Sequence, residues 1–334
     1  MCDYWPMAST ALRTPRICIV SPALAAANNG NWQTASRWQR FLAPACEVDV
    51  TTEWNDASPE ADLLIALHAR RSAASIERFR DRWPARPIVL ILTGTDLYRD
   101  LQSNEQARRS MQIATAIVVL QEYGTEQVDV AWRDRTRVIV QSAPSLVRNR
   151  SANDPDFLVV GHLRPEKDPQ TLWSALRSLA TDAARSTTVH IGGALEATLG
   201  DAARSAMSAC PDYRWLGELP HPATRERIAR ARALVHPSLV EGGANVVIEA
   251  MRSKVPVLAS RIDGNVGLLG PDYGGYFAAG DATSLAMLMR RFRDEPAFVE
   301  QLSGQCARRE PLFRTSAERR AVRALVADLI DGSA

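Results

Sequence analysis

Two glutamates flank a predicted helix start in the stretch VHPSLVEGGANVVIEA, residues 235–250. Glu241 precedes a pair of glycines, and Glu249 follows after seven intervening residues. Glycines allow a tight backbone turn, and a helix beginning near Gly243 or Ala244 would present free N–H groups to an anion. Glu249, about two turns into that helix, could accept hydrogen bonds from ribose hydroxyls, as an acid does in dinucleotide-binding folds. Its neighbours are apolar, so burial would require a partner for its carboxylate.

Cations that could neutralise a nucleotide's phosphates follow another predicted strand, in the segment GHLRPEKDP (161–169). Arg164 offers a planar fork to phosphate oxygens, and Lys167 offers a compact charge. A third segment, NNGNWQTASRW (28–38), would let backbone N–H groups near Gly30 approach a diphosphate from the opposite side. Each pattern alone also fits ordinary surface residues. Because all three follow predicted strands, together they indicate one ligand-binding cleft.

Strands and helices that alternate along the chain must position these segments. Short, nearly continuous apolar runs predict strands that are covered on both faces, as in a parallel sheet. They are expected at residues 16–20, 48–52, 62–68, 87–93, 116–121, 137–142, 156–162, 187–193, 213–217, 233–237, 256–260 and 275–277. Amphipathic helical patterns lie between them, for example at 32–43, 70–83 and 315–330. The alternation predicts an α/β fold of two tandem Rossmann-like domains whose parallel sheets face a central cleft.

A segment without periodicity, residues 143–156, contains prolines and polar residues and predicts a linker. The expected divisions are an N-terminal extension (1–16), a first domain (17–145), a second domain (146–312) and a terminal helical segment (313–334). The first sixteen residues lack the apolar core of a signal peptide, so a cytoplasmic location is expected. They are interpreted as an extension, within which Met7 could be the true start.

The composition, with 46% hydrophobic and 23% charged residues and a net charge of +2, is that of an ordinary soluble globular protein. Such a charge does not favour a nucleic-acid or membrane-surface partner, and no window approaches the roughly 20 apolar residues of a membrane span. The five cysteines are scattered, which indicates neither a disulfide framework nor a zinc site. The triplet Asp154–Pro155–Asp156 is interpreted as solvated loop rather than as a metal site.

The E-x7-E block, the G-x-L-R-x-x-K turn and the early glycine turn resemble the GT-B glycosyltransferases of family four, with a layout that covers nearly the whole chain. The resemblance implies that Glu249 grips the nucleotide ribose and Glu241 faces the donor sugar. Arg164 and Lys167 would neutralise the leaving diphosphate. The implied donor site also includes Gly30, Gly242, Gly243, Ala244 and Asn245. The final helix is expected to cross back to the first domain.

Departures from the common family pattern point to one subgroup. EGGA stands where many relatives have EGFG, SRIDGNVGLLG (260–270) lacks the usual donor-loop glutamate, and LTGTDLYRDL (92–101) stands where relatives often carry a histidine. Together with the other blocks, these look like the selenosugar synthases of selenoneine biosynthesis. That resemblance implies that selenophosphate attacks the anomeric carbon of a UDP-sugar, with UDP-N-acetylglucosamine as the first candidate. No protein-bound metal or further cofactor is implied.

A selenium anion is already ionised near neutral pH, so its transfer needs little general-base help. Its pocket should offer amides, hydroxyls and an arginine. The acceptor candidates are Asn28, Asn29, Trp32, Gln33, Thr93, Thr95 and Arg99 in the first domain and Asn265 in the second. Asp96 could act in catalysis by positioning acceptor or sugar, but it is also placed as a helix cap. His68 ends a strand on the cleft side, and its contact with a ligand is left open.

Three other interpretations fit parts of the sequence. An ordinary family-four transferase would act on a sugar or lipid hydroxyl. A sugar-nucleotide epimerase shares the layout but usually needs more carboxylates and histidines in the cleft. A ligand-binding protein without chemistry could have two tandem α/β domains, but such proteins are typically exported. The expected partners are a UDP-sugar and selenophosphate, and a homodimer is left open.

Overall fold

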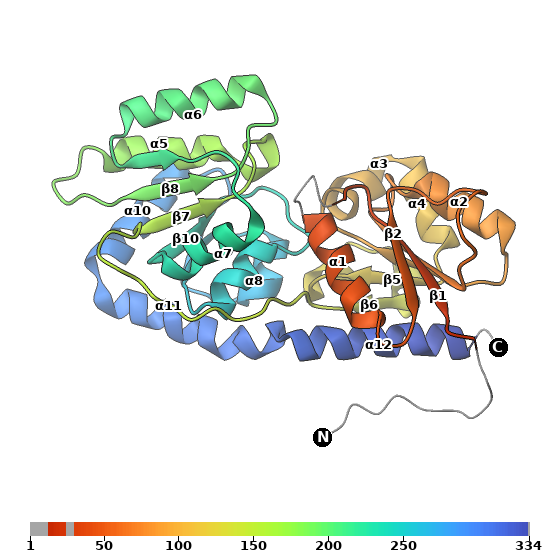
Figure 1. The fold of residues 1–334 in the computed structure, drawn as a ribbon. Coiled ribbons are helices and arrows are strands. Elements are labelled where there is room, and N and C mark those ends of the chain that lie inside the picture. The colour runs from red at the N-terminus through yellow and green to blue at the C-terminus, as the bar shows by residue number, and fades with distance from the viewer. Residues whose placement is uncertain (1–12, 25–29, 333–334) are drawn as a thin grey trace.

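Two six-stranded parallel sheets form the frame of the molecule (Figure 1). The computed structural model describes residues 13–24 and 30–332. The strand order is β2-β1-β3-β4-β5-β6 in the first sheet and β12-β11-β10-β7-β8-β9 in the second, and all neighbouring strands run parallel. The predicted α/β fold of two tandem Rossmann-like domains is confirmed.

All twelve predicted strands are present. Those of the first sheet are β1 (Arg16–Val20), β2 (Glu47–Thr51), β3 (Leu63–Leu67), β4 (Ile88–Ile91), β5 (Ala116–Val119) and β6 (Thr136–Val138). Those of the second are β7 (Phe157–Val160), β8 (Thr188–Ile191), β9 (Tyr213–Trp215), β10 (Ala233–His236), β11 (Val257–Ser260) and β12 (Tyr276–Phe277). Several end earlier than predicted. After β4, for example, Thr93 and Gly94 donate their N–H groups to the Asp96 carboxylate instead of to a neighbouring strand.

Helices and short turns connect the strands. In the first domain they are α1 (Gly30–Leu42), α2 (Ala73–Arg82), the π-helical turn η2 (Asp96–Asp100), α3 (Leu101–Ser103), α4 (Glu105–Ile113) and the 3₁₀ turns η3 (Glu122–Thr125) and η4 (Val130–Arg135). The second domain contains η5 (Pro165–Lys167), α5 (Pro169–Leu179), α6 (Ala197–Ala209), α7 (His221–Arg230), α8 (Asn245–Arg252), α9 (Asp263–Leu269), α10 (Ala282–Asp294), α11 (Pro296–Arg309) and η6 (Glu310–Phe313). The last helix is α12 (Thr315–Asp331).

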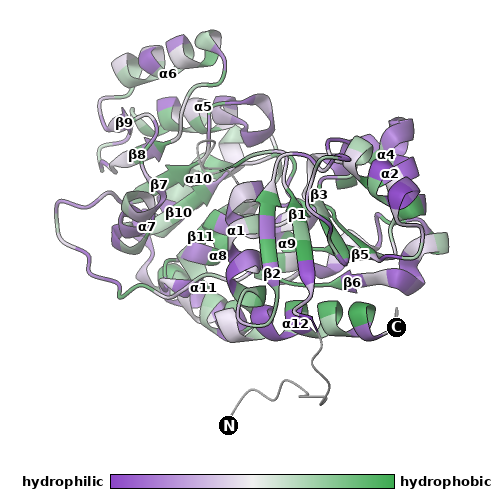
Figure 2. Ribbon diagram, turned by 45° about the vertical axis from the view of Figure 1, so that its right-hand side comes forward, coloured by the Kyte–Doolittle hydropathy of each residue, from purple (hydrophilic) through white to green (hydrophobic). Residues whose placement is uncertain are grey.

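The first sheet is buried because alternate side chains of its strands enter two separate cores. In β3, Leu63, Ile65 and Leu67 pack with α1 and α12, whereas Leu64 and Ala66 pack with α2 and α4. All five residues are buried, as expected for a strand with helices on both faces. Hydrophobic residues accordingly concentrate on the strands and on the helix faces that cover them (Figure 2).

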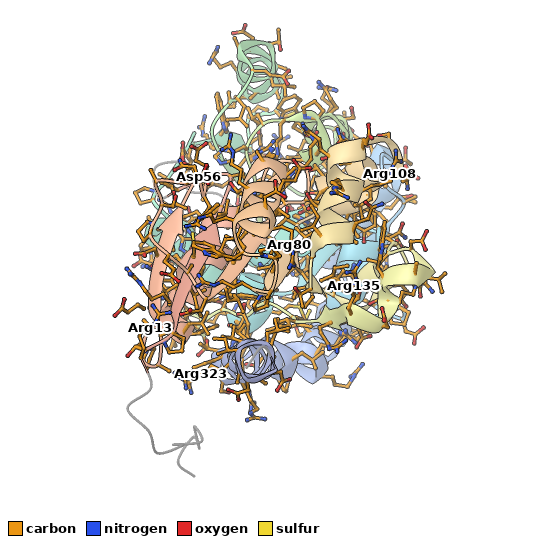
Figure 3. The ribbon with its side chains drawn as sticks, turned by 90° about the vertical axis from the view of Figure 1, so that its right-hand side faces the viewer. Arg13, Asp56, Arg80, Arg108, Arg135 and Arg323 are labelled. Carbon is orange, nitrogen blue, oxygen red and sulfur yellow. The ribbon has the colours of Figure 1, made fainter. Side chains whose placement is uncertain are left out.

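Charged side chains of both signs are interspersed over the outer surface of the first domain (Figure 3). Two of its arginines, Arg80 of α2 and Arg135 of η4, donate to the carbonyl oxygens of Ile113 and Met111 at the end of α4. These carbonyls lack partners within their own helix, so both arginines stabilise a helix end.

The chain passes between the domains twice, first after β6 and again between η6 and α12. The two passages lie side by side, since the N–H of Ala143 donates to the carbonyl oxygen of Phe313 (3.3 Å). α12 then packs along the first domain (Figure 1), where Val322 and Val326 are fully buried in the core that includes α1.

The strand order of each sheet reverses at one place, between β1 and β3 in the first sheet and between β7 and β10 in the second. Ligands of open α/β sheets bind outside the carboxyl ends of the strands at such a place. The segments that follow these four strands carry Gly30, His68, Arg164 and Glu241. The topology therefore directs the sequence motifs to the cleft between the domains.

Candidate active site

A cavity of about 310 Å³ lies at the carboxyl ends of the strands, and both domains line it. The first-domain wall consists of Gly30, Asn31, Gln33, Thr34, His68, Arg71, Thr93, Gly94, Thr95, Leu120 and Gln141. The second-domain wall consists of Val160, Gly161, His162, Arg164, Glu166, Lys167, Ile191, Gly192, Glu218, Leu219, His221, Thr224, Val240, Glu241, Gly243, Ala244, Asn245, Val246 and Glu249. The three segments singled out in the sequence therefore meet in one cavity.

Glu241 is held by two basic side chains of its own domain. The Lys167 ammonium donates to Glu241 Oε1, and His236 Nε2 lies 3.3 Å from the same oxygen. Burial would raise the pKa of the Glu241 carboxyl, but the Lys167 ammonium and His236 hold it well below its usual range. Burial also lowers the pKa of His236, although Glu241 opposes this shift. Glu241 is therefore a carboxylate at neutral pH, and Lys167 is engaged with it.

Arg164, which precedes η5, is a cation of the second-domain wall without a counter-ion. Among the described residues, no side chain forms an ion pair or hydrogen bond with its guanidinium, and its Nε atom is buried without a partner. An unpaired buried donor is costly. The site therefore supplies a positive group that an anionic ligand would satisfy.

Glu249 is nearly buried among apolar neighbours, and its carboxylate has the polar partner that such burial requires. His221 Nε2 lies 2.6 Å from Glu249 Oε1, and Arg225 Nε lies 3.9 Å from it. Glu249 is the fifth residue of α8, so it lies about one turn into the helix rather than the predicted two. His221 lines the cavity but was missed in the sequence. One sequence signal could have indicated it: His221 follows Pro220 at the start of a helix that comes after a predicted strand.

Both glycines lie against the first domain, and Gly243 also lines the cavity, so the prediction of a donor-site contact is corrected for Gly242. A Cβ atom on Gly242 would come within 2.6 Å of the Thr93 carbonyl, and one on Gly243 within 2.9 Å of Leu120 Cβ. Gly242 does not line the cavity, whereas Gly243, Ala244 and Asn245 do. α8 begins at Asn245, one or two residues later than predicted.

Asp96 is fully buried and does not line the cavity. Its Oδ1 accepts from the N–H groups of Thr93 (2.9 Å) and Gly94 (3.0 Å), and its Oδ2 accepts from the N–H of Ala69 (2.9 Å). The catalytic assignment is therefore corrected: Asp96 holds the turn that presents Thr93 and Thr95 to the cavity.

The acceptor candidates that the structure describes divide into two groups. Gln33, Thr93 and Thr95 line the cavity, as does the donor candidate Gly30. Trp32, Arg99 and Asn265 do not line it. Arg99 instead pairs with Glu166 across the domains (3.0 Å), and Asn265 is fully buried with its amide nitrogen on Ser260. Asn28 and Asn29 lie outside the described residues.

His68 does line the cavity, in an unusual backbone conformation. Its φ of 73° lies in the left-handed region, which is costly for a residue with a side chain. The ring is buried, with Nε2 3.2 Å from Thr95 Oγ1. Burial lowers the pKa of His68, against the opposing effect of Asp96.

In the described part of the chain, no cluster of three or more His, Cys, Asp or Glu side chains is placed to hold a metal ion. Asp154 binds Ser151 and Asp156 binds Thr187, both away from the cavity. None of the described helices has the length and apolar character needed to cross a membrane.

Comparisons with known proteins agree with this architecture. Residues 147–308 match the family model of glycosyl transferases group 1. Anabaena HepE in complex with UDP-glucose is 15% identical, with a TM-score of 0.75 over 94% of this chain and 100% of that chain. Sucrose-phosphate synthase from Thermosynechococcus elongatus is 18% identical, with a TM-score of 0.76 over 96% of this chain and 100% of that chain. A glycosyltransferase from Rickettsia africae is 12% identical, with a TM-score of 0.72 over 96% of this chain and 99% of that chain. The predicted GT-B fold is confirmed.

Proposed function

We propose that this chain, whose second domain is a glycosyl transferases group 1 domain within a GT-B fold, is a glycosyltransferase that moves a sugar from a UDP-sugar onto selenophosphate. The product is a 1-selenosugar, and UDP and phosphate are released. N-acetylglucosamine is the sugar to test first, because the resemblance to the selenosugar synthases implies it.

The observation that carries the donor assignment is the unpaired Arg164 guanidinium in a cavity that also contains two nearly buried carboxylates, Glu241 and Glu249. A ligand that satisfies the guanidinium must be anionic, and one that satisfies the carboxylates must carry hydroxyl groups. A nucleoside diphosphate sugar has both kinds of group. Arg164 then binds the diphosphate and Glu249 accepts from the ribose. Glu241 faces the sugar, and Lys167, which lines the same cavity, shares its charge with the leaving phosphate. HepE, of the same fold, has been solved with UDP-glucose bound.

The transfer forms one bond at the anomeric carbon and breaks one there. The selenium of selenophosphate attacks that carbon, and the bond from the carbon to the diphosphate oxygen breaks with its electron pair leaving on UDP. Water then cleaves the phosphorus–selenium bond, which gives phosphate and the selenol. The proposal needs no metal held by the protein, because Arg164 and Lys167 stabilise the charge on the leaving diphosphate.

The composition of the first-domain wall supports an acceptor that is already ionised. None of the described first-domain residues that line the cavity is a carboxylate, and Asp96 is buried behind the wall. His68 is the titratable base on this wall, and both its ring nitrogens already have partners. A hydroxyl acceptor would need a general base, whereas a selenium anion does not.

The test is anaerobic incubation with a panel of UDP-sugars, with and without selenophosphate, followed by mass spectrometry. We expect a selenium-bearing sugar formed together with UDP, and its loss in Glu249→Ala and Lys167→Ala. If UDP-sugars bind but no selenosugar forms with any of them, the acceptor assignment is wrong. Transfer to sugar or lipid hydroxyls in the same assay would favour an ordinary family-four transferase.

A further inference from the structure

The first-domain wall of the cavity carries three neighbouring donors, His68, Arg71 and Thr95, that the donor site does not use. We infer that they form an oxyanion subsite that holds the phosphoryl group of the acceptor. This inference rests on the proposed function and names the residues that would bind selenophosphate.

The subsite lies where the topology of the first sheet favours a ligand. His68 is the first residue after β3, at the place where the strand order reverses between β1 and β3. Arg71 follows just before α2, and Thr95 follows the neighbouring strand β4. In the second domain, Arg164 and Lys167 follow β7, one of the two strands that border the reversal there. Each domain therefore places basic side chains at its own reversal point.

Hydrogen bonds orient the His68 ring and the Thr95 hydroxyl. The N–H of Arg71 donates to His68 Nδ1 (3.4 Å), so the proton of the neutral ring is on Nε2. Nε2 then donates to Thr95 Oγ1, 3.2 Å away. Because a hydroxyl has one hydrogen of its own and this one accepts from His68, that hydrogen is available to a ligand oxygen. Thr95 thus presents a donor to the cavity.

Arg71 supplies the charge. Its exposed guanidinium lines the cavity and, among the described residues, has no ion pair or hydrogen bond. The neighbouring Arg70 differs, since its Nε lies 2.8 Å from Asp100 Oδ2. A guanidinium fork suits the oxygens of a phosphoryl group.

The nearby acids do not cancel this charge. Asp96 Oδ2 lies 3.9 Å from His68 Nδ1, but three backbone N–H groups and the Thr93 hydroxyl already donate to its carboxylate. Asp100 Oδ2 lies 4.0 Å from His68 Nε2 and is paired with Arg70. The first-domain wall therefore keeps one uncompensated positive charge, on Arg71.

Within the described part of the chain, two guanidinium groups of the cavity are thus unpaired, Arg71 on one wall and Arg164 on the other. A diphosphate bound at Arg164 that does not reach Arg71 would leave Arg71 without an anionic partner. Two anionic groups on separate substrates account for both, with the donor's diphosphate at Arg164 and the acceptor's phosphoryl group at Arg71. Holding that group at the first-domain wall would leave selenium free to face the donor sugar.

The experiment compares Arg71→Gln with Arg78→Gln. Arg78 is exposed on α2, the helix that follows Arg71, and does not line the cavity, so its variant makes the same charge change away from the site. At saturating UDP-sugar we expect Arg71→Gln to raise the KM for selenophosphate by about tenfold or more, the effect of losing one charge-assisted hydrogen bond. The Kd for UDP should stay unchanged in both variants, and the KM should stay unchanged in Arg78→Gln.

Two further variants test the remaining donors. Thr95→Val removes the hydroxyl at nearly constant size, and the asparagine of His68→Asn tolerates the left-handed backbone better than most residues with a side chain. Both should raise the KM for selenophosphate without changing the Kd for UDP. Equal KM values in Arg71→Gln and Arg78→Gln would overturn the subsite, as would a parallel loss of UDP binding in Arg71→Gln.

A binding measurement separates this inference from the proposed function. Inorganic thiophosphate is titrated calorimetrically into the UDP-loaded wild type and into Arg71→Gln. If the wild type makes no selenosugar, the proposed acceptor is wrong, but thiophosphate binding that depends on Arg71 would still support a phosphoryl subsite. Absence of thiophosphate binding to the wild type would overturn the subsite.

Discussion

The ammonium of Lys167 donates a hydrogen bond to Oε1 of Glu241 in the second-domain wall of the cavity. The lysine expected to neutralise the leaving diphosphate is therefore held by the acid expected to face the sugar. His236 lies behind the same carboxylate oxygen. Binding of a diphosphate would give Lys167 a second anionic partner, which couples the sugar end of the site to its phosphate end.

Removing Lys167 should destabilise the protein, because it leaves a nearly buried carboxylate with His236 alone. We expect Lys167→Met to lower the free energy of unfolding by about 3 kcal/mol, at the lower end for a broken buried pair. The double variant Lys167→Met/Glu241→Gln should recover part of this loss. Urea unfolding at pH 7 measures both. Equal stability of Lys167→Met and wild type would show that the pair contributes nothing.

The same pair predicts a pH dependence of stability. The pKa of Glu241 is lower in the folded protein than in the unfolded chain. Its contribution is therefore complete above the ordinary glutamate pKa of about 4.3 and is lost as the pH falls below that value towards the folded pKa. Between neutral pH and acid, the wild type should lose more unfolding free energy than Glu241→Gln. Denaturant titrations at several pH values test this, and parallel curves for the two proteins would contradict it.

Glu249 and His221 should act as a unit in nucleotide binding. Glu249→Gln and His221→Phe are each expected to weaken UDP binding by about tenfold. His221→Phe breaks the 2.6 Å hydrogen bond that orients the carboxylate, and Glu249→Gln removes the negative charge that accepts from the ribose most strongly. Glu226→Gln is the matched control, since Glu226 is exposed on α7 and does not line the cavity. Calorimetric titration with UDP measures the Kd of each of the three variants. A normal affinity in His221→Phe would remove the histidine from the site.

Gly242→Ala should prevent the two domains from meeting as they do here. A Cβ atom at this position would lie 2.6 Å from the backbone carbonyl of Thr93, so one domain must move. We expect a larger radius of gyration by solution scattering and a turnover lower by about tenfold or more, because the reacting groups would be misplaced. Gly304→Ala in α11 is the control, since its nearest neighbour would be Arg308 at 3.8 Å. An unchanged radius and turnover in Gly242→Ala would contradict the prediction.

Glu318 of α12 should contribute strongly to stability. Its buried carboxylate accepts from Arg37 Nε (2.7 Å), Trp38 Nε1 (2.9 Å) and the N–H of Ser142 (2.7 Å). Glu318→Ala leaves Arg37 buried without its counter-ion, and a loss of about 3–5 kcal/mol is expected. Asp328→Asn, an exposed change on the same helix, should have no such effect. Chemical denaturation measures both, and a small loss in Glu318→Ala would show that water replaces the carboxylate.

Much of the fold could be predicted because the signals are local. A buried strand such as β3 is a run of five apolar residues, and such runs alternate with amphipathic helices through both domains. That alternation predicts parallel sheets whose strand ends carry the ligand. The placement of Arg164, Glu241 and Glu249 in one cavity follows from the same reasoning, since each follows a strand that borders a reversal in strand order.

The sequence by itself thus determined the two-domain α/β architecture and the segments that line the cleft, because hydrophobic periodicity and turn residues act over a few positions. Only the tertiary structure decided which charges are paired. Lys167 meets Glu241 across 74 positions, and His221 meets Glu249 across 28. Asp96, which resembled a catalytic acid, accepts from three backbone N–H groups and the Thr93 hydroxyl, while the guanidinium groups of Arg71 and Arg164 have no partner among the described residues. Pairing depends on distances between elements that are remote in sequence, and no local pattern encodes those distances.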